Sequence, residues 1–359
     1  MHVEQVVLSG KLSGNGQYTQ LCQDFFTEKF GFKKCLLTTS CTDALEMCAL
    51  LLDLKPGEEV IVPSFTFVST ALAFAGRGAK IVFADSQPDN PNIDVESVKS
   101  MITEKTRAVV VMHYAGYACR MDELSELLSE KNIFLIEDAA LSLGTTFNNA
   151  FTGSFGHFSA FSFHETKNIM CGEGGMLVIN DELFADRAKI LWEKGTNRVD
   201  FAEGKAKKYE WVDFGSSFLP SELIAAFLYG QLNEYERIQN LRKNVWILYA
   251  ERLTDLKKNK FINFPDYYSN GSMFHFFVLE TDLRDKLLTY LQLNGINAVF
   301  HYLPLHLSPF YLKNNKITSL PFAENFAASV VRLPFFPDLK KPEIEFICRK
   351  ISDFFENQT

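Results

Sequence analysis

Lys167 stands at the end of an apolar run, in the stretch FSFHETKN, and the glycine-rich IMCGEGG follows it at once. A lysine at a strand end is usually a surface residue, but lysine is also the side chain that forms Schiff bases with carbonyl compounds. Gly172, Gly174 and Gly175 would let a loop pass close to a ligand without a Cβ in the way. The neighbours of Lys167 therefore decide between the two interpretations.

A second stretch, TTSCTDA, places small hydroxyl residues just before a helical pattern. Backbone N–H groups at a helix start, with the helix dipole behind them, form a cradle for phosphate. Ser40, Cys41 and Thr42 are the candidate residues, and an ordinary Ser/Thr N-cap is the structural alternative. Ser162, five residues before the lysine, can also reach an anion.

Phe67 and Asp138 follow two further predicted strands, SFTFVST and FLIEDAA. The ring of Phe67 could cover one face of a flat heterocycle, although many of the 34 phenylalanines must belong to a core. Asp138 could pair with a protonated ring nitrogen, or it could simply cap the next segment. Lys167 comes one strand–loop–strand excursion after Asp138, so both can face one crevice.

A phosphate cradle, a stacking ring, an acid and a lysine together describe a site for pyridoxal 5'-phosphate. The lysine would supply the Schiff-base amine, and the aspartate would keep the pyridine nitrogen protonated so that the ring acts as an electron sink. The cysteines form no CxxC pair, and the sequence predicts no metal site.

Short β-rich runs alternate with helical patterns from about residue 35 to 180, which predicts an α/β fold. Seven such strands indicate a mostly parallel sheet with helices on both faces. In such sheets the ligand lies outside the carboxyl ends of the strands. The runs are CLLTTS, EEVIVPSFTFV, AKIVFADS, AVVVMHYAG, IFLIEDAA, FSAFSFH and GGMLVIN.

The second half of the chain has a different character. A long helical pattern covers residues 220–253, and short strands such as MFHFFVLE and NAVFHYLP follow it before further helices. We therefore expect a large α/β domain with an N-terminal helix over residues 1–230 and a smaller α+β domain over residues 231–359.

Composition narrows the class of protein. The chain has 359 residues, 47% of them hydrophobic, and a formal net charge of −8. Acids and bases are mixed along it, which argues against a nucleic-acid or membrane partner. Seven cysteines without pairing motifs favour a reducing compartment, and no apolar run reaches transmembrane length. We expect a cytoplasmic protein.

At these residues the sequence resembles the DegT/DnrJ/EryC1/StrS sugar aminotransferases, which are fold-type I, aspartate-aminotransferase-like enzymes. The resemblance covers nearly the whole chain and is nearest to the dTDP-4-amino-4,6-dideoxygalactose transaminase branch. It is carried by SGKLSGNG, TTSCTDALEM, VPSFTFVST, GAKIVFAD, HYAG, IEDAA, FSFHETKN with GEGG, EKGTNR and FHYLPLH.

The resemblance implies a role for each candidate residue. Lys167 matches the Schiff-base lysine, Asp138 the partner of the pyridine nitrogen and Phe67 the stacking ring. The phosphate contacts fall on Cys41, Thr42 and Ser162, with Ser40 beside them, and the backbone amide of Cys41 would serve. His306 matches a position near the nucleotide sugar, although a loop histidine remains the alternative. Tyr302 and Arg198 are further candidate substrate contacts.

Two departures from the family pattern concern the site. Relatives commonly carry glutamine or histidine after DAA, whereas this chain has Leu141, which cannot hydrogen-bond to a cofactor. The family's GxNYR, whose asparagine reaches the phosphate of the neighbouring subunit, reads GSSFL here, so Ser217 is the shorter substitute. The resemblance thus implies a homodimer with shared active sites.

The implied reaction moves an amino group from L-glutamate to carbon 4 of dTDP-4-keto-6-deoxy-D-glucose, in the making of deoxyamino sugars. Three alternatives remain. The acceptor could be a 3-keto sugar, or the chain could be a catalytically silent subunit that binds the cofactor or a sugar nucleotide. A related dehydratase would resemble the family with histidine in place of Lys167, so the lysine argues against it.

Overall fold

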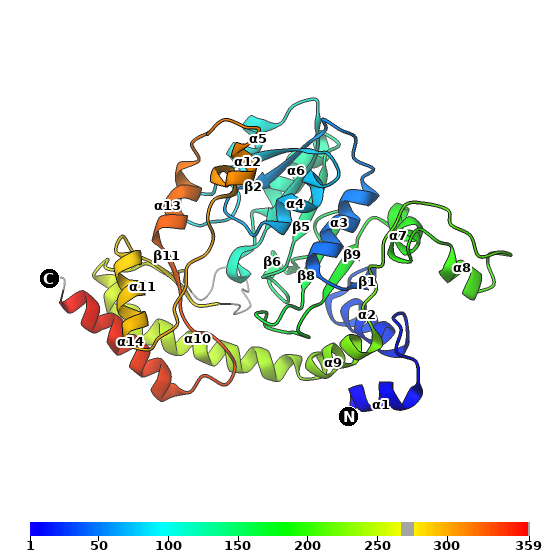
Figure 1. Ribbon diagram of the computed structural model, residues 1–359. Helices are drawn as coiled ribbons and strands as arrows, with labels where there is room; N and C mark the ends of the chain where they lie inside the picture. The colour runs from blue at the N-terminus through cyan, green and yellow to red at the C-terminus, as the bar shows by residue number, and fades with distance from the viewer. Residues whose placement is uncertain (267–275, 358–359) are drawn as a thin grey trace.

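A computed structural model describes residues 1–266 and 276–357 of the chain (Figure 1). The seven runs form one seven-stranded sheet in the order β1-β9-β8-β5-β4-β2-β3. The strands from β8 to β3 are parallel, and β9 runs antiparallel to both of its neighbours. The strands are β1 (Lys34–Thr38), β2 (Glu59–Pro63), β3 (Lys80–Ala84), β4 (Thr106–Met112), β5 (Phe134–Asp138), β8 (Phe158–Ser162) and β9 (Gly175–Ile179). The predicted mostly parallel α/β fold is confirmed.

Helices cover both faces of this sheet, because successive side chains of a strand point to opposite faces and the side chains on both faces are apolar. In β4, Val110 and Met112 pack towards α3, α4 and α7, whereas Val109 and Val111 pack towards α5 and α6. Helices α2 and α9 cover the second face beside β1 and β9. The helices of this region are α1 (His2–Ser9), α2 (Gln17–Phe30), α3 (Cys41–Leu51), α4 (Ser69–Ala75), α5 (Val95–Met101), α6 (Met121–Glu130), α7 (Ala185–Trp192), α8 (Arg198–Ala202) and α9 (Glu222–Asn233).

A separate core forms in the second half of the chain, where α10, α11 and α14 pack around a two-stranded sheet. Figure 1 shows the long α10 leading from α9 to this region. Its elements are α10 (Tyr235–Lys258), β10 (Val278–Glu280), α11 (Arg284–Leu293), α12 (Pro309–Leu312), α13 (Pro321–Ser329), β11 (Val330–Arg332) and α14 (Lys341–Glu356).

In the second half of the chain, several elements differ from those that the sequence patterns predict. The helical pattern over residues 220–253 is two helices, because the chain leaves helical geometry at Glu234. The domain boundary expected after residue 230 falls inside α9, and the division into domains stays a prediction. The run NAVFHYLP forms only a single bridge, between Val299 and Arg332. The first three residues of MFHFFVLE lie outside the described residues, and its last three residues form β10.

Short elements connect these parts. They are the two-stranded sheet of β6 (Thr146–Phe147) and β7 (Ala150–Phe151), and the 3-10 turns η1 (Tyr114–Gly116), η2 (Glu182–Phe184) and η3 (Leu305–Leu307). All seven cysteines are free thiols. Within residues 1–266 and 276–357, no helix is long and apolar enough to cross a membrane.

The strand register brings the site residues together. Met112 pairs with Asp138 at the ends of β4 and β5, and Asp138 pairs with Ala160 of β8, two residues before Ser162. The carboxyl ends of these parallel strands therefore meet at one edge of the sheet. This is the edge at which parallel sheets place their ligands.

Candidate active site

A cavity of about 620 Å³ opens at this edge, and Lys167 and Asp138 both line it. Most of the residues predicted from the sequence lie around it. These are Ser40, Cys41, Thr42, Phe67, Asp138, Ser162, Lys167 and Tyr302. Residues from β4, β5, β8, the start of α3 and the second half of the chain thus share one space.

Lys167 is held by a tight excursion of the chain after β8. The N–H of Phe163 donates to the carbonyl of Gly174, and the N–H of Lys167 donates to the carbonyl of His164, at 2.8 and 2.9 Å. Burial lowers the pKa of the Lys167 ammonium, although Cys41 and Asp138 act in the opposite direction. The amine is therefore neutral for a larger share of the time than that of an exposed lysine.

Asp138 is 4% exposed and accepts two hydrogen bonds from the protein. The hydroxyl of Thr70 donates to Oδ2 at 2.7 Å, and the N–H of Ala140 donates to Oδ1 at 3.1 Å. Burial raises the pKa of this carboxyl, and the two hydrogen bonds oppose the rise. A cation in the cavity would favour the charged carboxylate further. The contact with Ala140 shows that the capping role and the cofactor role are compatible.

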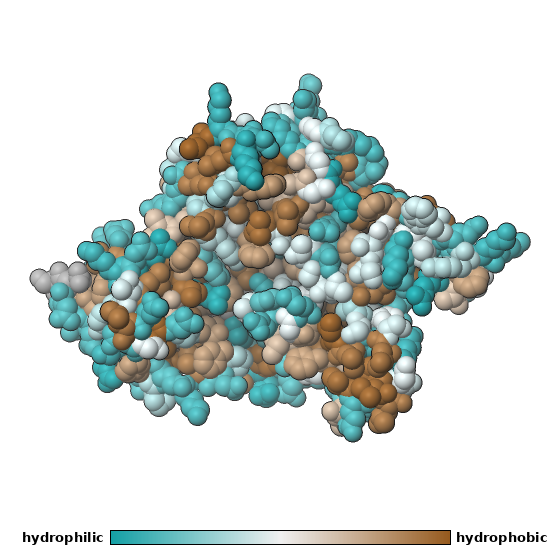
Figure 2. All heavy atoms as spheres, in the orientation of Figure 1, coloured by the Kyte–Doolittle hydropathy of each residue, from teal (hydrophilic) through white to brown (hydrophobic). Residues whose placement is uncertain are grey.

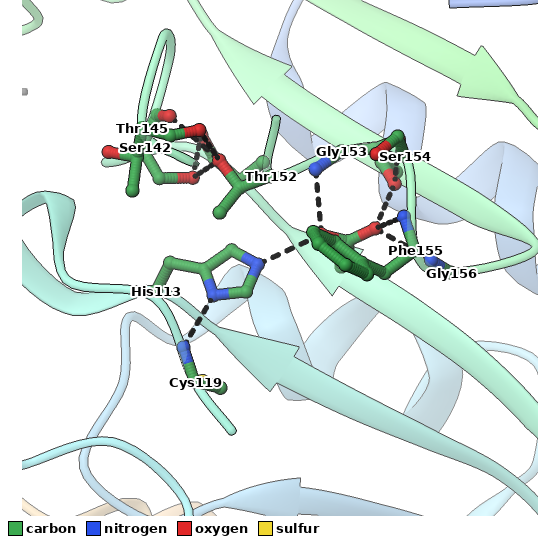
Figure 3. A network of polar contacts seen from close by, with 12 residues as sticks. His113, Cys119, Ser142, Thr145, Thr152, Gly153, Ser154, Phe155 and Gly156 are labelled. Carbon is green, nitrogen blue, oxygen red and sulfur yellow. Dashed lines mark hydrogen bonds and ion pairs between the residues drawn. The ribbon is translucent and has the colours of Figure 1, made fainter. Parts of the chain in front are cut away.

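A buried network fixes the strand end that carries Asp138. Its neighbour Glu137 is fully buried and points to the other side of β5. His113 accepts the N–H of Cys119 at Nδ1, so its Nε2–H donates to Glu137 at 3.0 Å (Figure 3). Burial raises the pKa of Glu137, but the hydrogen bonds from His113 and the loop amides outweigh it and lower that pKa. The other donors to Glu137 are the amides of Gly153, Phe155 and Gly156 and the hydroxyl of Ser159.

The start of α3 has the geometry of a phosphate cradle. Ser40 is the N-cap, and its hydroxyl accepts the N–H of Asp43 at 3.0 Å. The amides of Cys41 and Thr42 have no earlier carbonyl within the helix to bind, so they can face an anion. Burial raises the pKa of the Cys41 thiol well above its usual range, which keeps it protonated. The hydroxyl of Ser40 therefore caps the helix, while the amides of Cys41 and Thr42 remain available for a phosphate.

The glycines after Lys167 serve the protein itself more than a ligand. A Cβ on Gly175 would lie 2.4 Å from the backbone of Ser40, and one on Gly174 would lie 2.5 Å from the sulfur of Cys171. Gly172 has a φ of +83° and open space around it. Close packing of β9 against the start of α3 therefore accounts for Gly175, in place of the loop–ligand approach expected from the sequence.

Phe67 and Leu141 were ambiguous in the sequence. Phe67 is 56% exposed, which excludes a place in the core, and its ring lies 6.3 Å from that of Tyr302 across the cavity. Leu141 is 2% exposed and packs in the core while also lining the cavity. Its apolar side chain forms part of the cavity wall, and leucine cannot hydrogen-bond to a cofactor there, as expected from the sequence.

Three of the predicted site residues do not line the cavity. His306 is fully buried, 2.6 Å from the hydroxyl of Ser64 and 3.3 Å from Glu324, and does not line the cavity. Ser217 is exposed on the segment that carries α8, which projects away from the sheet (Figure 1). Arg198 begins α8 and lies 3.9 Å from Glu193. Their substrate or cofactor roles stay predictions.

The structure adds His301, Arg332 and Phe276 to the cavity wall. The nitrogen Nη1 of Arg332 lies 2.8 Å from Nε2 of His301, and the guanidinium lies 4.3 Å from the ring centre of Phe276. His301 stands in the quoted segment FHYLPLH, so it could have been singled out. Nothing in the sequence around Arg332 distinguishes it from any other charged residue at a strand end.

The residues of the cavity fit pyridoxal 5'-phosphate. The start of α3 offers amides for the phosphate, Asp138 offers a buried carboxylate for the ring nitrogen, and Lys167 offers an amine for the aldehyde. Phe67 could cover the ring from the open side. Within the described residues, no cluster of three histidine, cysteine or acidic side chains could hold a metal ion.

Comparison with known proteins agrees with this arrangement. A model of the DegT/DnrJ/EryC1/StrS aminotransferase family matches residues 1–352. The GDP-perosamine synthase of Vibrio cholerae is 29% identical, over 99% of this chain and 95% of its own length. Among solved structures, DesV of S. venezuelae is 30% identical with a TM-score of 0.90, over 98% and 93% of the two chains. PseC of Helicobacter pylori, an aminotransferase involved in the biosynthesis of pseudoaminic acid, is 25% identical with a TM-score of 0.91, over 99% and 95%.

Proposed function

Because the chain belongs to the DegT/DnrJ/EryC1/StrS aminotransferase family, we propose that it aminates carbon 4 of a nucleotide-linked 4-keto-6-deoxyhexose with L-glutamate as the donor. The protein is a pyridoxal 5'-phosphate-dependent sugar aminotransferase. The observation that carries the proposal is the meeting of Lys167 and Asp138 in a single large cavity. That space has room for a substrate beside the cofactor.

Each residue of the cavity has a separate role in this reaction. Bound pyridoxal 5'-phosphate supplies an electron sink for the carbon atom whose proton is transferred. Lys167 takes a proton from the amino-acid carbon and returns one during the transfer to the sugar. Asp138 holds the proton on the ring nitrogen, and the amides of Cys41 and Thr42 bind the phosphate. Leu141 and Met112 keep water from the buried side of the site.

We propose dTDP-4-keto-6-deoxy-D-glucose as the acceptor. The segments FSFHETKN, GTNR and FHYLPLH support this choice, because they resemble the branch that aminates this sugar at carbon 4. The Vibrio cholerae relative is named for a product carried on GDP, so GDP is the competing carrier. A 3-keto sugar could enter the same cavity in a rotated position, since small pocket contacts decide such discrimination.

A competition assay tests this substrate. The enzyme receives L-glutamate and equal amounts of a 4-keto dTDP sugar, its 3-keto isomer and a 4-keto GDP sugar, and the products are identified by mass spectrometry and NMR. We expect amination of the dTDP sugar at carbon 4. Amination only at carbon 3, or a preference for the GDP sugar, would contradict the assignment. A yellow protein whose absorbance does not change with L-glutamate would favour a silent binding subunit.

We further propose an obligate homodimer in which Ser217 and Arg198 complete the partner's active site. Both residues lie outside the cavity of their own chain. Trp211 and Phe214 on the same segment are 80% and 54% exposed, and such apolar exposure is typical of a contact surface. Figure 2 shows a second gathering of apolar atoms over α1, where Leu8 is 80% exposed.

Mixed subunits test the sharing of sites. Lys167→Ala and Arg198→Glu subunits should each be inactive alone, since each lacks one part of every site. After unfolding and refolding together, half of the dimers should be hybrids with one intact site in two, so about a quarter of the wild-type activity should return. Asp138→Asn is the control partner that should not complement, because Asp138 and Lys167 line the same cavity of one chain and every hybrid site would lack one of them. A mixture that stays inactive would show that Arg198 does not act across the dimer.

A further inference from the structure

Two buried threonines stand behind the cavity in the segment SFTFVST, from which the sequence singles out only Phe67. Thr66 lies in the turn between β2 and α4, and Thr70 lies in the first turn of α4. Their side chains are buried, with 1% and 0% of their surface exposed, and neither lines the cavity. Their hydroxyl oxygens lie 2.7 Å apart. This contact therefore closes the turn that presents Phe67 to the cavity.

The hydroxyl of Thr70 connects this turn to Asp138. It donates to Oδ2 at 2.7 Å, across 68 residues of chain. A threonine in a helix commonly bonds to a backbone carbonyl of the preceding turn instead. An ionised carboxylate can only accept hydrogen bonds, and a hydroxyl has one proton. Because Thr70 gives its proton to Asp138, the contact between the threonines must be a donation from Thr66 to Thr70.

The two hydroxyls thus form a threonine relay that runs from Thr66 through Thr70 to Asp138. A hydroxyl that accepts a hydrogen bond becomes a better donor, so Thr66 strengthens the bond from Thr70. Burial raises the pKa of Asp138, and the hydrogen bond from Thr70 is the largest of the effects that oppose this rise. The titratable groups that interact with this carboxyl are Lys167, His113, Cys41, Cys48 and Tyr302.

We propose that Thr70, oriented by Thr66, is a positioning residue that holds the Asp138 carboxylate in its ionised form as the partner of the cofactor's ring nitrogen. This inference deepens the proposed function and rests on its assignment of Asp138. A weakly basic carboxylate leaves the shared proton on the nitrogen, whereas a more basic one takes it. The protonated nitrogen is what makes the cofactor an electron sink. The threonine relay therefore acts on the reaction through Asp138 alone.

NMR of the holoenzyme, loaded with cofactor that carries a labelled ring nitrogen, tests the threonine relay. The chemical shift of this nitrogen distinguishes its protonated form from its neutral form, and the wild type should show the protonated form at neutral pH. Thr70→Val removes the hydroxyl but keeps the branched shape, and should move the signal towards the neutral form. Thr70→Ser keeps the hydroxyl and should resemble the wild type. Thr66→Val should move the signal in the same direction as Thr70→Val, by a smaller amount.

Kinetics give the size of the effect. Thr70→Val should lower the rates of both half-reactions by about tenfold, the loss expected for a hydrogen bond to a charged group. Thr66→Val should lower them by about two- to threefold, because it weakens this bond without removing it. The dissociation constant of L-glutamate in single turnovers should stay close to the wild-type value, because the threonine relay does not line the cavity.

Thr19→Val is the matched control. The hydroxyl of Thr19 donates to the carboxylate of Glu222, and both residues are buried and lie outside the lining of the cavity. This variant loses the same kind of hydrogen bond from the same residue type. Its melting temperature should fall as that of Thr70→Val does, while the nitrogen signal and the rates stay as in the wild type. Only the loss at Thr70 should reach the ring nitrogen.

The outcomes separate the threonine relay from the assignment of Asp138. If Asp138→Asn moves the nitrogen signal, but Thr70→Val leaves the signal unchanged and the rates within about twofold of the wild type, the proposal is overturned and Asp138 keeps its role. If neither variant moves the signal, the assignment of Asp138 itself fails. If Thr70→Val does not fold, Thr66→Val decides, because it leaves the donor to Asp138 in place. A Thr66→Val signal identical to that of the wild type would then overturn the relay.

Discussion

Replacing Lys167 with alanine is expected to lower the rate of transamination by about 10²–10⁴, the range typical of losing a positioned proton-transfer group. The side chain lines the cavity beside Asp138. Burial lowers its pKa, which favours the neutral amine. The loss should appear in the rate constant for each half-reaction, because the same amine moves the proton in both. The fold should survive, since the backbone turn that carries residue 167 is held by its own hydrogen bonds.

A chemical readout distinguishes this role from a structural one. Borohydride treatment of the wild-type holoenzyme should leave the cofactor attached to the peptide that contains Lys167, and mass spectrometry detects it. Lys167→Ala should show no attachment at any lysine. Lys131→Ala is the matched control, because Lys131 is exposed at the end of α6. Near-normal turnover of Lys167→Ala would remove the central claim of the mechanism.

Local sequence signals were enough to locate this part of the site. The strand ends carrying Ser162 and Asp138 follow apolar runs of strand length, and parallel connection places such ends at one edge. The sequence also marked Ser40 as a helix N-cap. Each of these signals lies within a few residues of the side chain concerned. This is why the sequence alone could propose Lys167, Asp138 and the start of α3 as candidates, and the structure places all three around one cavity.

Long-range contacts could not be predicted in the same way. Arg332 reaches the cavity because β11 pairs with β10 and with Val299, and no local pattern reports that pairing. His306 was a candidate ligand from its sequence position, but its contact with Ser64 is made across 242 residues of chain. The pairing partners of a buried polar side chain depend on the tertiary fold, whereas a strand or a cap depends mainly on its neighbours in sequence.

The two acids of FLIEDAA illustrate the same limit. The sequence shows that Glu137 and Asp138 face opposite sides of one strand, but both sides are buried. Only the structure shows that the carboxylate of Glu137 accepts hydrogen bonds from the backbone amides of Gly153 and Gly156. Asp138 accepts two hydrogen bonds from the protein and lines the cavity. The choice between the two carboxylates therefore follows from counting their donors.

Replacing Asp138 with asparagine is expected to lower turnover by about 10²–10³, the loss typical of removing one preorganised electrostatic contact. A neutral amide cannot balance a positive charge on the cofactor's ring nitrogen. The same substitution can keep both contacts with the protein. The amide oxygen can still accept the N–H of Ala140, and the amide nitrogen can donate to the hydroxyl of Thr70 in place of accepting from it.

This conservation of contacts makes the measurement specific. The melting temperature of Asp138→Asn and its ability to bind the cofactor should stay close to wild type, while the rates of both half-reactions fall together. Asp122→Asn, an exposed acid in the first turn of α6, is the matched control and should change none of these quantities. If Asp138→Asn turns over normally, the carboxylate only caps the turn at Ala140, and the electron sink must be maintained without it. If it instead unfolds, Thr70 cannot reverse its hydrogen bond, and the carboxylate is required first for the structure of the strand end.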